Sequence, residues 1–171
     1  KYHIWSIMDL TNAFHQIPIA PDARPITPFV TPHGHYQWTC MHFGISNAPS
    51  RQQRVMQEIF GKHTNLVVYL DDLLVGTEWQ GSEEATLEKH LCDVRDVLNT
   101  MRQNAFKVKL KKCRFFRTAI TFLGHRLSNG KRTPTDEKLR VLREWPLPRT
   151  PKDLKSWLGF VGFYHMYLKD L

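Results

Sequence analysis

The pattern of apolar and polar residues predicts two strand regions, one alternating and one almost wholly apolar, and each contains at least one acidic residue. The first run covers residues 4–10 and places Asp9 at the end of a strand. The second run, residues 66–75, is apolar except for Asp71 and Asp72, and it is too short on either side of them for a helix. This pattern predicts a β-hairpin with the two aspartates at its tip.

Other segments follow the strand pattern or the helix pattern. Further strands are expected at residues 29–31, 36–40, 105–110 and 120–127. The first two would form a hairpin with its turn at Gly34. Helices are expected at residues 46–61, from Ser82 onward, and after the capping candidates Thr135 and Thr150. The apolar face of the helix from Ser82 is expected to pack in the core, and it consists of Leu87, Leu91, Val94, Leu98 and Met101.

The positive charge of the chain is unevenly distributed. The net charge is +8, and six lysines and arginines fall within residues 107–117. Such a cluster favours a polyanionic partner, because each cation that neutralises a phosphate releases a counterion. A solvated surface strand has the same pattern, so charge alone does not decide between the two.

Composition disfavours two classes of protein. The three cysteines have no CxxC pairing, so neither a disulfide framework nor a cysteine zinc site is supported, and a reducing, intracellular setting is expected. The longest apolar run is about half of the ~20 residues that a membrane span needs, so we expect no membrane segment. The chain starts without an initiator methionine or a secretory leader, and we interpret it as part of a longer protein.

The adjacent aspartates inside an apolar run need a physical explanation. Unpaired carboxylates beside a core are unfavourable unless hydrogen bonds or a cation compensate them, although Asp-Asp also occurs in ordinary tight turns. Because neighbouring strands lie ~5 Å apart, Asp9 could join Asp71 and Asp72 around one cation. Carboxylate oxygens suit Mg²⁺, and a pair of such ions promotes in-line phosphoryl transfer. The pattern indicates either a plain turn or a metal-dependent phosphoryl-transfer site.

Three blocks of the sequence occur in a distinctive order, at residues 5–17, 41–49 and 69–75. They resemble the palm motifs of reverse transcriptases from gypsy-type (Ty3/gypsy, Metaviridae-like) long-terminal-repeat retrotransposons. Segments similar to the same family follow at residues 111–115, 122–125 and 158–164. The resemblance implies an α+β polymerase palm, with an antiparallel sheet packed on helices and partial fingers, in residues 1–132. The start of a helical thumb or connection would occupy residues 133–171.

The resemblance also implies an activity, an RNA-directed DNA polymerase that adds deoxynucleotides to a primer 3′-hydroxyl by two-metal nucleotidyl transfer. The implied catalytic acids are Asp9, Asp71 and Asp72, of which Asp9 and Asp71 would be the direct ligands of Mg²⁺. Leu10 would complete the set of metal ligands, and Mn²⁺ could substitute for Mg²⁺. The implied nucleotide-binding residues are Thr11, Asn12, Ala13, Phe14, Phe43 and Asn47. The implied primer grip is Leu123, Gly124 and His125.

Several of these residues have a simpler structural explanation. Phe14 matches the aromatic residue that excludes a ribose 2′-hydroxyl, but a core phenylalanine fits the pattern equally well. Asn47 could be a helix cap, and Gly124 could mark a bulge in a strand. The family usually has proline where His42 stands, a basic residue in place of Ile26 and leucine in place of Met8, and none of these departures removes a catalytic acid.

The implied partners are an RNA or DNA template with its primer, deoxynucleoside triphosphates, and the RNase H, integrase and protease parts of a retroelement polyprotein. Phosphate contacts in the expected thumb could come from Lys138, Arg140, Arg143, Lys152 and Lys155. The expected location is the cytoplasm or a retroelement particle, with the nucleus as an alternative. Two other functions are open from the sequence: an inactive or domesticated retroelement-derived module that binds nucleic acid, and a two-metal nuclease with water as nucleophile.

Overall fold

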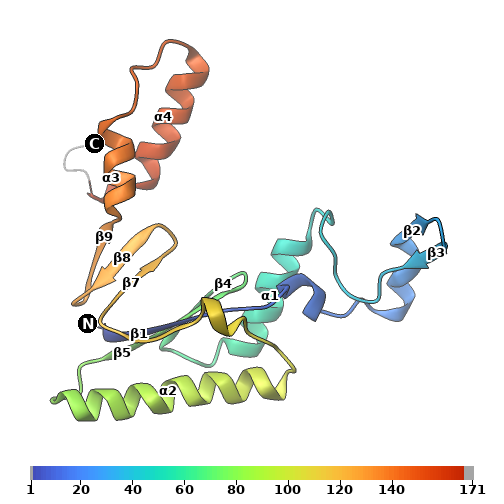
Figure 1. The fold of residues 1–171 in the computed structure, drawn as a ribbon, viewed down its shortest axis with the longest axis horizontal. Helices are drawn as coiled ribbons and strands as arrows, with labels where there is room; N and C mark the ends of the chain where they lie inside the picture. Colours follow the sequence, from blue (N-terminus) through green and yellow to red (C-terminus); the bar gives the residue numbers. More distant parts are fainter. Residues whose placement is uncertain (1, 168–171) are drawn as a thin grey trace. The chain divides into compact units, whose positions relative to one another are not determined.

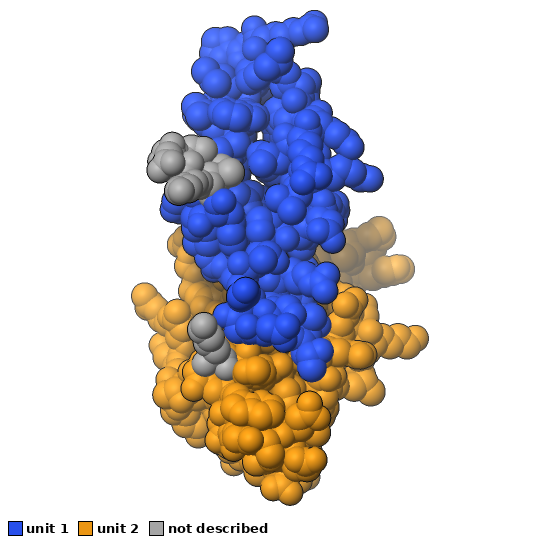
Figure 2. Space-filling model, turned by 90° about the vertical axis from the view of Figure 1, so that its left-hand side faces the viewer, with its two compact units in different colours: residues 1, 118–171 blue, residues 2–117 orange. Residues whose placement is uncertain are grey.

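The computed structural model describes residues 2–167. The chain divides into two compact units, one of residues 2–117 and one that begins at Thr118, shown in orange and blue in Figure 2. We call them the first and the second unit. The sequence placed a change of unit between residues 132 and 133, and the last residues of that expected segment, 168–171, lie outside the described part of the chain.

The first unit is built on a four-stranded antiparallel sheet (Figure 1). In spatial order its strands are β4 (Leu66–Tyr69), β5 (Asp72–Glu78), β1 (Tyr2–Asp9) and β6 (Arg114–Arg117). Two helices, α1 (Ala48–Phe60) and α2 (Glu83–Gln103), pack against this sheet. Their shared core consists of buried apolar residues from strands and helices, among them Met8, Leu73, Val75, Met56 and Val97. The α+β fold expected from the sequence is confirmed.

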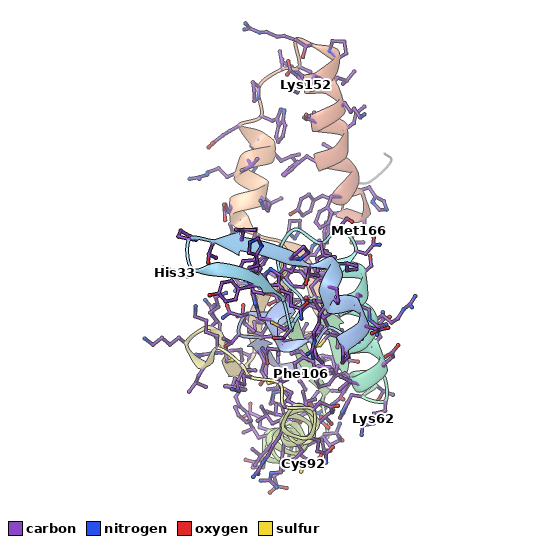
Figure 3. The ribbon with its side chains drawn as sticks, turned by 90° about the vertical axis from the view of Figure 1, so that its right-hand side faces the viewer. His33, Lys62, Cys92, Phe106, Lys152 and Met166 are labelled. Atoms are coloured by element: carbon purple, nitrogen blue, oxygen red, sulfur yellow. The ribbon has the colours of Figure 1, made fainter. Side chains whose placement is uncertain are left out.

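The helix α2 buries only part of the apolar face that the sequence predicted. Leu87, Leu91 and Leu98 are 38–45% exposed, and the buried face instead includes the polar residues His90 and Asp93. Figure 3 views α2 end-on, with exposed Cys92 on its outer side and Phe106, which packs against the core, on its inner side. The prediction is confirmed for Val94 and Met101, which are buried in the core. It was wrong for the three leucines, because it ranked side chains by hydropathy alone, whereas hydrogen bonds compensate the buried polar ones.

A buried hydrogen-bond network explains how α2 can bury polar side chains. His90 lies between Ser6 of β1, at 2.7 Å, and Thr77 of β5, at 2.8 Å. Thr77 donates to Asp93 Oδ2 at 2.7 Å, and the main-chain N–H of Phe116 donates to Ser6 Oγ at 3.1 Å. Ser6 and His90 are fully buried, so this serine and histidine join the sheet to the helix and do not form a nucleophilic site.

The remaining elements of the first unit lie in the segments that connect the strands of the four-stranded sheet and the two helices. The short helices are η1 (Ala13–Gln16), η2 (Pro21–Ile26) and η3 (Leu110–Lys112). The expected hairpin is present as β2 (Pro28–Thr31) and β3 (Gly34–Gln37), with its turn at residues 32–33 and Gly34 already in the second strand. The strand expected at residues 105–110 is wrong, because only Val108 forms an isolated bridge there, and the basic run itself supplies β6.

The second unit combines a three-stranded antiparallel sheet with two helices. Its strands are β7 (Ala119–Phe122), β8 (His125–Ser128) and β9 (Lys131–Pro134). They precede α3 (Asp136–Arg143), α4 (Pro151–Phe163) and η4 (His165–Tyr167). The predicted cap of α4 is confirmed, because Thr150 and Asp153 form a reciprocal capping box. No helix in residues 2–167 is long and apolar enough to span a bilayer.

Gln52 is expected to reduce the stability of the fold. It faces inward from α1 and is 1% exposed, and neither atom of its side-chain amide has a hydrogen-bond partner among the described residues. Gln52→Met, which keeps the size of the side chain and removes its polar atoms, should raise the free energy of unfolding by about 1–3 kcal/mol. Urea denaturation of the chain measures this gain, with exposed Gln57→Met as the control. A Gln52→Met chain of unchanged or lower stability would show that the amide is paired.

Candidate active site

The two strand ends of the first unit bring Asp9 and Asp72 side by side. Asp9 is the last residue of β1, Asp72 is the first residue of β5, and the two are directly paired in the antiparallel register. Side chains alternate along a strand, and on these strands Ser6 and Thr77 point toward α2. By this alternation the two carboxylates project from the opposite face of the sheet, away from the helices. The strand register thus places Asp9 beside Asp72, and the expectation that Asp9, Asp71 and Asp72 meet around one cation stays a prediction.

Asp71 lies in the two-residue turn that joins β4 to β5. Its main-chain oxygen accepts a hydrogen bond of 2.9 Å from the N–H of Leu10, which ties the turn to the end of β1. Leu70, the other turn residue, has φ +52°, in the left-handed region. For a residue with a β-carbon that conformation costs roughly 1–2 kcal/mol, and such turns usually use glycine, asparagine or aspartate. The acids therefore sit on a strained turn that needs support from its surroundings.

One cation in the first unit contacts the acids directly. Lys112 Nζ lies 3.0 Å from Asp9 Oδ2, and this hydrogen bond, together with the nearby negative charge, raises the pKa of Lys112. The pKa of Asp72 is also raised, first by burial and then by repulsion from Asp71 and Asp9, which Lys112 only partly offsets. Among the described residues, the ion pair found at these three carboxylates joins the exposed ammonium group of Lys112 to Asp9.

This excess of negative charge is suited to a divalent cation. Hard carboxylate oxygens are the ligands that Mg²⁺ prefers, and a cation beside them would relieve the repulsion that raises the Asp72 pKa. Within residues 2–167, however, no three acidic, histidine or cysteine side chains are arranged closely enough to hold a metal ion as they stand. The carboxylates of Asp9, Asp71 and Asp72 suit the ligand preference of Mg²⁺. One carboxylate oxygen of Asp9 is hydrogen-bonded to Lys112.

The residues expected to face a nucleotide continue directly from Asp9. Thr11 donates its N–H to the carbonyl of Lys107 at 2.9 Å, and Asn12 has φ +44°, so the chain turns sharply into η1. Ala13 is buried, whereas Phe14 is half-buried and meets the ring of Phe43 edge to face, with ring centroids 5.4 Å apart.

The residues expected to bind the nucleotide or the metal ion differ in how deeply their side chains are buried. Phe43 is 67% exposed, and Phe14 packs partly against the small apolar cluster around Ile17, so Phe14 has features of both a core ring and a surface ring. Leu10 buries its side chain in the core, so only its main chain could face a metal ion. Asn47 stands at the N-cap of α1, but its side chain makes no capping hydrogen bond.

The expected primer-grip residues lie in the second unit. Leu123 and Gly124 form the turn between β7 and β8, with φ values of +48° and +79°, so the hairpin implied by the resemblance is present. Leu123 is 39% exposed. His125 is buried, and its Nδ1 lies 2.9 Å from the hydroxyl of Tyr167, which indicates a structural role for its side chain.

Three residues of this region were not singled out by the sequence. Lys112 was one member of a basic run, and its contact with Asp9 joins residues 103 positions apart. Gln16 bonds the main chains of Thr11 and Lys107, and Gln53 bonds the main chain on both sides of Tyr69. Isolated glutamines have no sequence signature that predicts such contacts.

An antiparallel sheet backed by helices, with three carboxylates at one end of two central strands, is the architecture of a polymerase palm. The family described as "Reverse transcriptase (RNA-dependent DNA polymerase)" matches residues 1–127. That match covers well over half of the chain, and the chain belongs to this family.

Relatives of the chain are transposon polyproteins. It is 32% identical over 168 residues to the Retrovirus-related Pol polyprotein from transposon 412 of Drosophila melanogaster, which covers 97% of the chain and 13% of that protein. It is 27% identical over 167 residues to the Transposon Tf2-3 polyprotein of Schizosaccharomyces pombe, covering 96% of the chain and 12% of that protein. The chain therefore spans less than one sixth of either relative.

Solved structures with the same fold come from foamy viral protease-reverse transcriptase. A form of that protein in complex with double-stranded DNA matches with a TM-score of 0.82 and 29% identity, covering 95% of the chain and 28% of that protein. The protein in complex with an RNA/DNA hybrid matches with a TM-score of 0.74 and 29% identity, covering 94% and 21%. The palm fold expected from the sequence is confirmed by these matches.

Proposed function

We propose that this chain provides the palm of an RNA-directed DNA polymerase, which extends a primer with deoxynucleotides. The observation that carries the proposal is the register of β1 against β5, which pairs Asp9 with Asp72 next to the turn that holds Asp71. Membership of the reverse transcriptase family supports the same activity. The two alternatives from the sequence have no comparable support.

In the proposed reaction the chain's own residues hold the reactants and balance charge. Asp9, Asp71 and Asp72 would hold two Mg²⁺ ions, with Mn²⁺ as a substitute and the main chain of Leu10 completing the site. When bound, the ions would lower the pKa of the primer 3′-hydroxyl and neutralise the leaving pyrophosphate. The exposed ammonium of Lys112, already next to Asp9, is placed to stabilise negative charge at the same end of the sheet.

The proposed substrates are a primer–template duplex and deoxynucleoside triphosphates. The six cationic residues from Lys107 to Arg117 are all exposed, and they include Lys112 beside the acids, so they offer an electropositive surface for phosphates. The foamy viral relatives were solved with double-stranded DNA and with an RNA/DNA hybrid. Since the relatives are polyproteins, we also propose that RNase H, integrase and protease parts accompany this chain, in the cytoplasm or in a retroelement particle.

Primer extension tests the proposal. The complete protein that contains this chain should extend a DNA primer on an RNA template with deoxynucleotides and Mg²⁺, and chelation of the metal should stop it. A folded protein that binds the primer–template but incorporates nothing would contradict the proposal and favour a binding module. Shortening of the labelled primer or template in place of extension would favour a nuclease.

The role of Phe14 in sugar selection can be measured separately. Phe14→Val keeps an apolar contact with the Ile17 cluster but removes the ring that would occupy the space of a 2′-hydroxyl. The ratio of kcat/KM for deoxynucleotides over ribonucleotides should fall about tenfold to a hundredfold, as expected when a steric clash of roughly 1–3 kcal/mol is relieved. Phe14→Tyr retains the ring and should retain the selection. Equal ratios in Phe14→Val and the unchanged protein would show that Phe14 is only a core residue.

A further inference from the structure

Gln53 of α1 pairs with the outer edge of β4. Its Oε1 accepts a hydrogen bond of 2.8 Å from the N–H of Leu70, and its Nε2 donates one of 3.1 Å to the carbonyl of Val68. β4 is an edge strand of the sheet, with β5 on one side only. A side-chain amide carries one donor and one acceptor, as a peptide group does, so Gln53 takes the place of a neighbouring strand at this point.

The hydrogen bond to Leu70 acts on the strained residue of the turn. Leu70 is the turn residue in the left-handed region, at φ +52°. Its N–H points away from β5 and reaches Gln53, so the bond holds Leu70 in a conformation that leucine would otherwise leave. The next two residues along the chain are Asp71 and Asp72.

The turn is therefore fixed from two sides. On the β1 side, the N–H of Leu10 donates to the carbonyl of Asp71 at 2.9 Å. On the α1 side, the amide of Gln53 holds the main chain just before Asp71. Loss of either support would let Asp71 and Asp72 move relative to Asp9, whose position in β1 is set by its own strand pairing.

We propose that Gln53 is a positioning residue that keeps Asp71 and Asp72 in register with Asp9. The catalytic consequence of this inference rests on the proposed polymerase function. The hydrogen bonds of Gln53 are observed in the structure whatever the function is. Both of these hydrogen bonds of Gln53 go to main-chain atoms, so it would influence the reaction through the main chain of the turn. Its loss should lower the rate of the chemical step and leave substrate binding nearly unchanged.

The experiment compares Gln53→Met with Gln57→Met in the complete protein that contains this chain. Methionine preserves the length of the glutamine side chain without its hydrogen bonds, and Gln57 is an exposed glutamine one turn further along α1. In Gln53→Met, kcat for primer extension should fall about tenfold to a hundredfold, the effect of a misplacement of about 1 Å at a reacting centre. KM for the nucleotide and Kd for the primer–template should stay within about twofold, and Gln57→Met should match the unchanged protein.

Two further measurements separate positioning from general loss of structure. Hydrogen exchange at the Leu70 amide should accelerate in Gln53→Met, while exchange within the core of α2 should not. Leu70→Gly, which removes the strain, should reduce the effect of Gln53→Met on kcat in a double-mutant cycle. Additive effects on kcat, an unchanged Leu70 exchange rate, or an equal loss of kcat and primer–template binding would each overturn the proposal.

Failure of the proposed function gives a different result. If the unchanged protein extends no primer, the polymerase proposal fails, and the exchange rate at Leu70 still decides whether Gln53 holds the turn. If the unchanged protein is active and Gln53→Met is equally active, the polymerase proposal stands and the positioning role of Gln53 is wrong.

Discussion

Replacement of Asp71 by asparagine is expected to abolish nucleotide incorporation and to leave primer–template binding intact. Asparagine has the size of aspartate but lacks the charge that would hold a divalent cation. A metal ion supplies several kcal/mol of charge stabilisation in the transition state, and each ~1.4 kcal/mol changes a rate about tenfold, so the loss should be about a thousandfold or more. Single-turnover primer extension measures the rate, and fluorescence anisotropy of a labelled duplex measures binding.

The fold should tolerate this substitution well. Asp71 is exposed in its turn, and its link to β1 is made by its main-chain carbonyl, which asparagine retains. Removal of one carboxylate also lessens the repulsion that helps to raise the Asp72 pKa. Asp96→Asn, at an exposed position of α2, is the matched control for loss of an acidic residue. Incorporation by Asp71→Asn at the rate of this control would rule out a role for Asp71 in catalysis.

Acidification between pH 6.5 and pH 4 is expected to destabilise the first unit through His90. Burial is the main cause that lowers the pKa of His90 from 6.5 to about 4, and the nearby Asp93 carboxylate opposes that shift. The unfolded chain therefore binds a proton to this ring at a higher pH than the folded chain does. The stability from neutral His90 is fully present above pH 6.5 and is lost as the pH falls toward 4, by about 3 kcal/mol in total.

The hydrogen-bond network shows why the neutral ring is required. Thr77 donates its hydroxyl hydrogen to Asp93, so it accepts from His90 Nδ1, which makes Nδ1 the protonated nitrogen. His90 Nε2 is then the acceptor for the Ser6 hydroxyl, which in turn accepts the N–H of Phe116. A proton added to Nε2 would face the hydroxyl hydrogen of Ser6, and the network would lose a bond.

Urea denaturation of the chain at pH 7 and pH 4.5 tests this prediction. His90→Gln should show a smaller decrease in the free energy of unfolding between the two pH values than the unchanged chain, because the titrating ring is gone. His35→Gln, which removes an exposed histidine of β3, is the matched control. The same decrease in His90→Gln as in the unchanged chain would mean that other groups cause the acid sensitivity.

Local patterns in the sequence were sufficient to predict the structure wherever contacts between neighbouring residues determine it. The strand that ends at Asp9 follows from short-range alternation, the hairpin that carries Asp71 and Asp72 follows from two short apolar runs, and both are present. The capping box of Thr150 and Asp153 spans four residues and was equally readable. Each depends on contacts within one strand, one turn or one helical end.

Predictions that assumed that the most apolar side chains are the buried ones were less successful. Leu91 was expected in the core and is exposed, whereas His90 beside it is fully buried. The sequence cannot rank these neighbours, because the burial of His90 depends on partners in β1 and β5, far away along the chain. The strand expected at residues 105–110 was wrong for a similar reason, since Val108 pairs with Leu10 only as an isolated bridge and no strand forms there.

The amino-acid sequence by itself singled out three acids as candidates, because Asp9, Asp71 and Asp72 stand in or at the end of apolar runs, where an uncompensated carboxylate is unfavourable. Only the tertiary structure decided how they meet. The register of β1 on β5 pairs Asp9 with Asp72, and Lys112 and Gln53 reach this end of the sheet from elsewhere in the chain. Such contacts depend on packing between residues far apart in the chain, so no periodic pattern in the sequence predicts them.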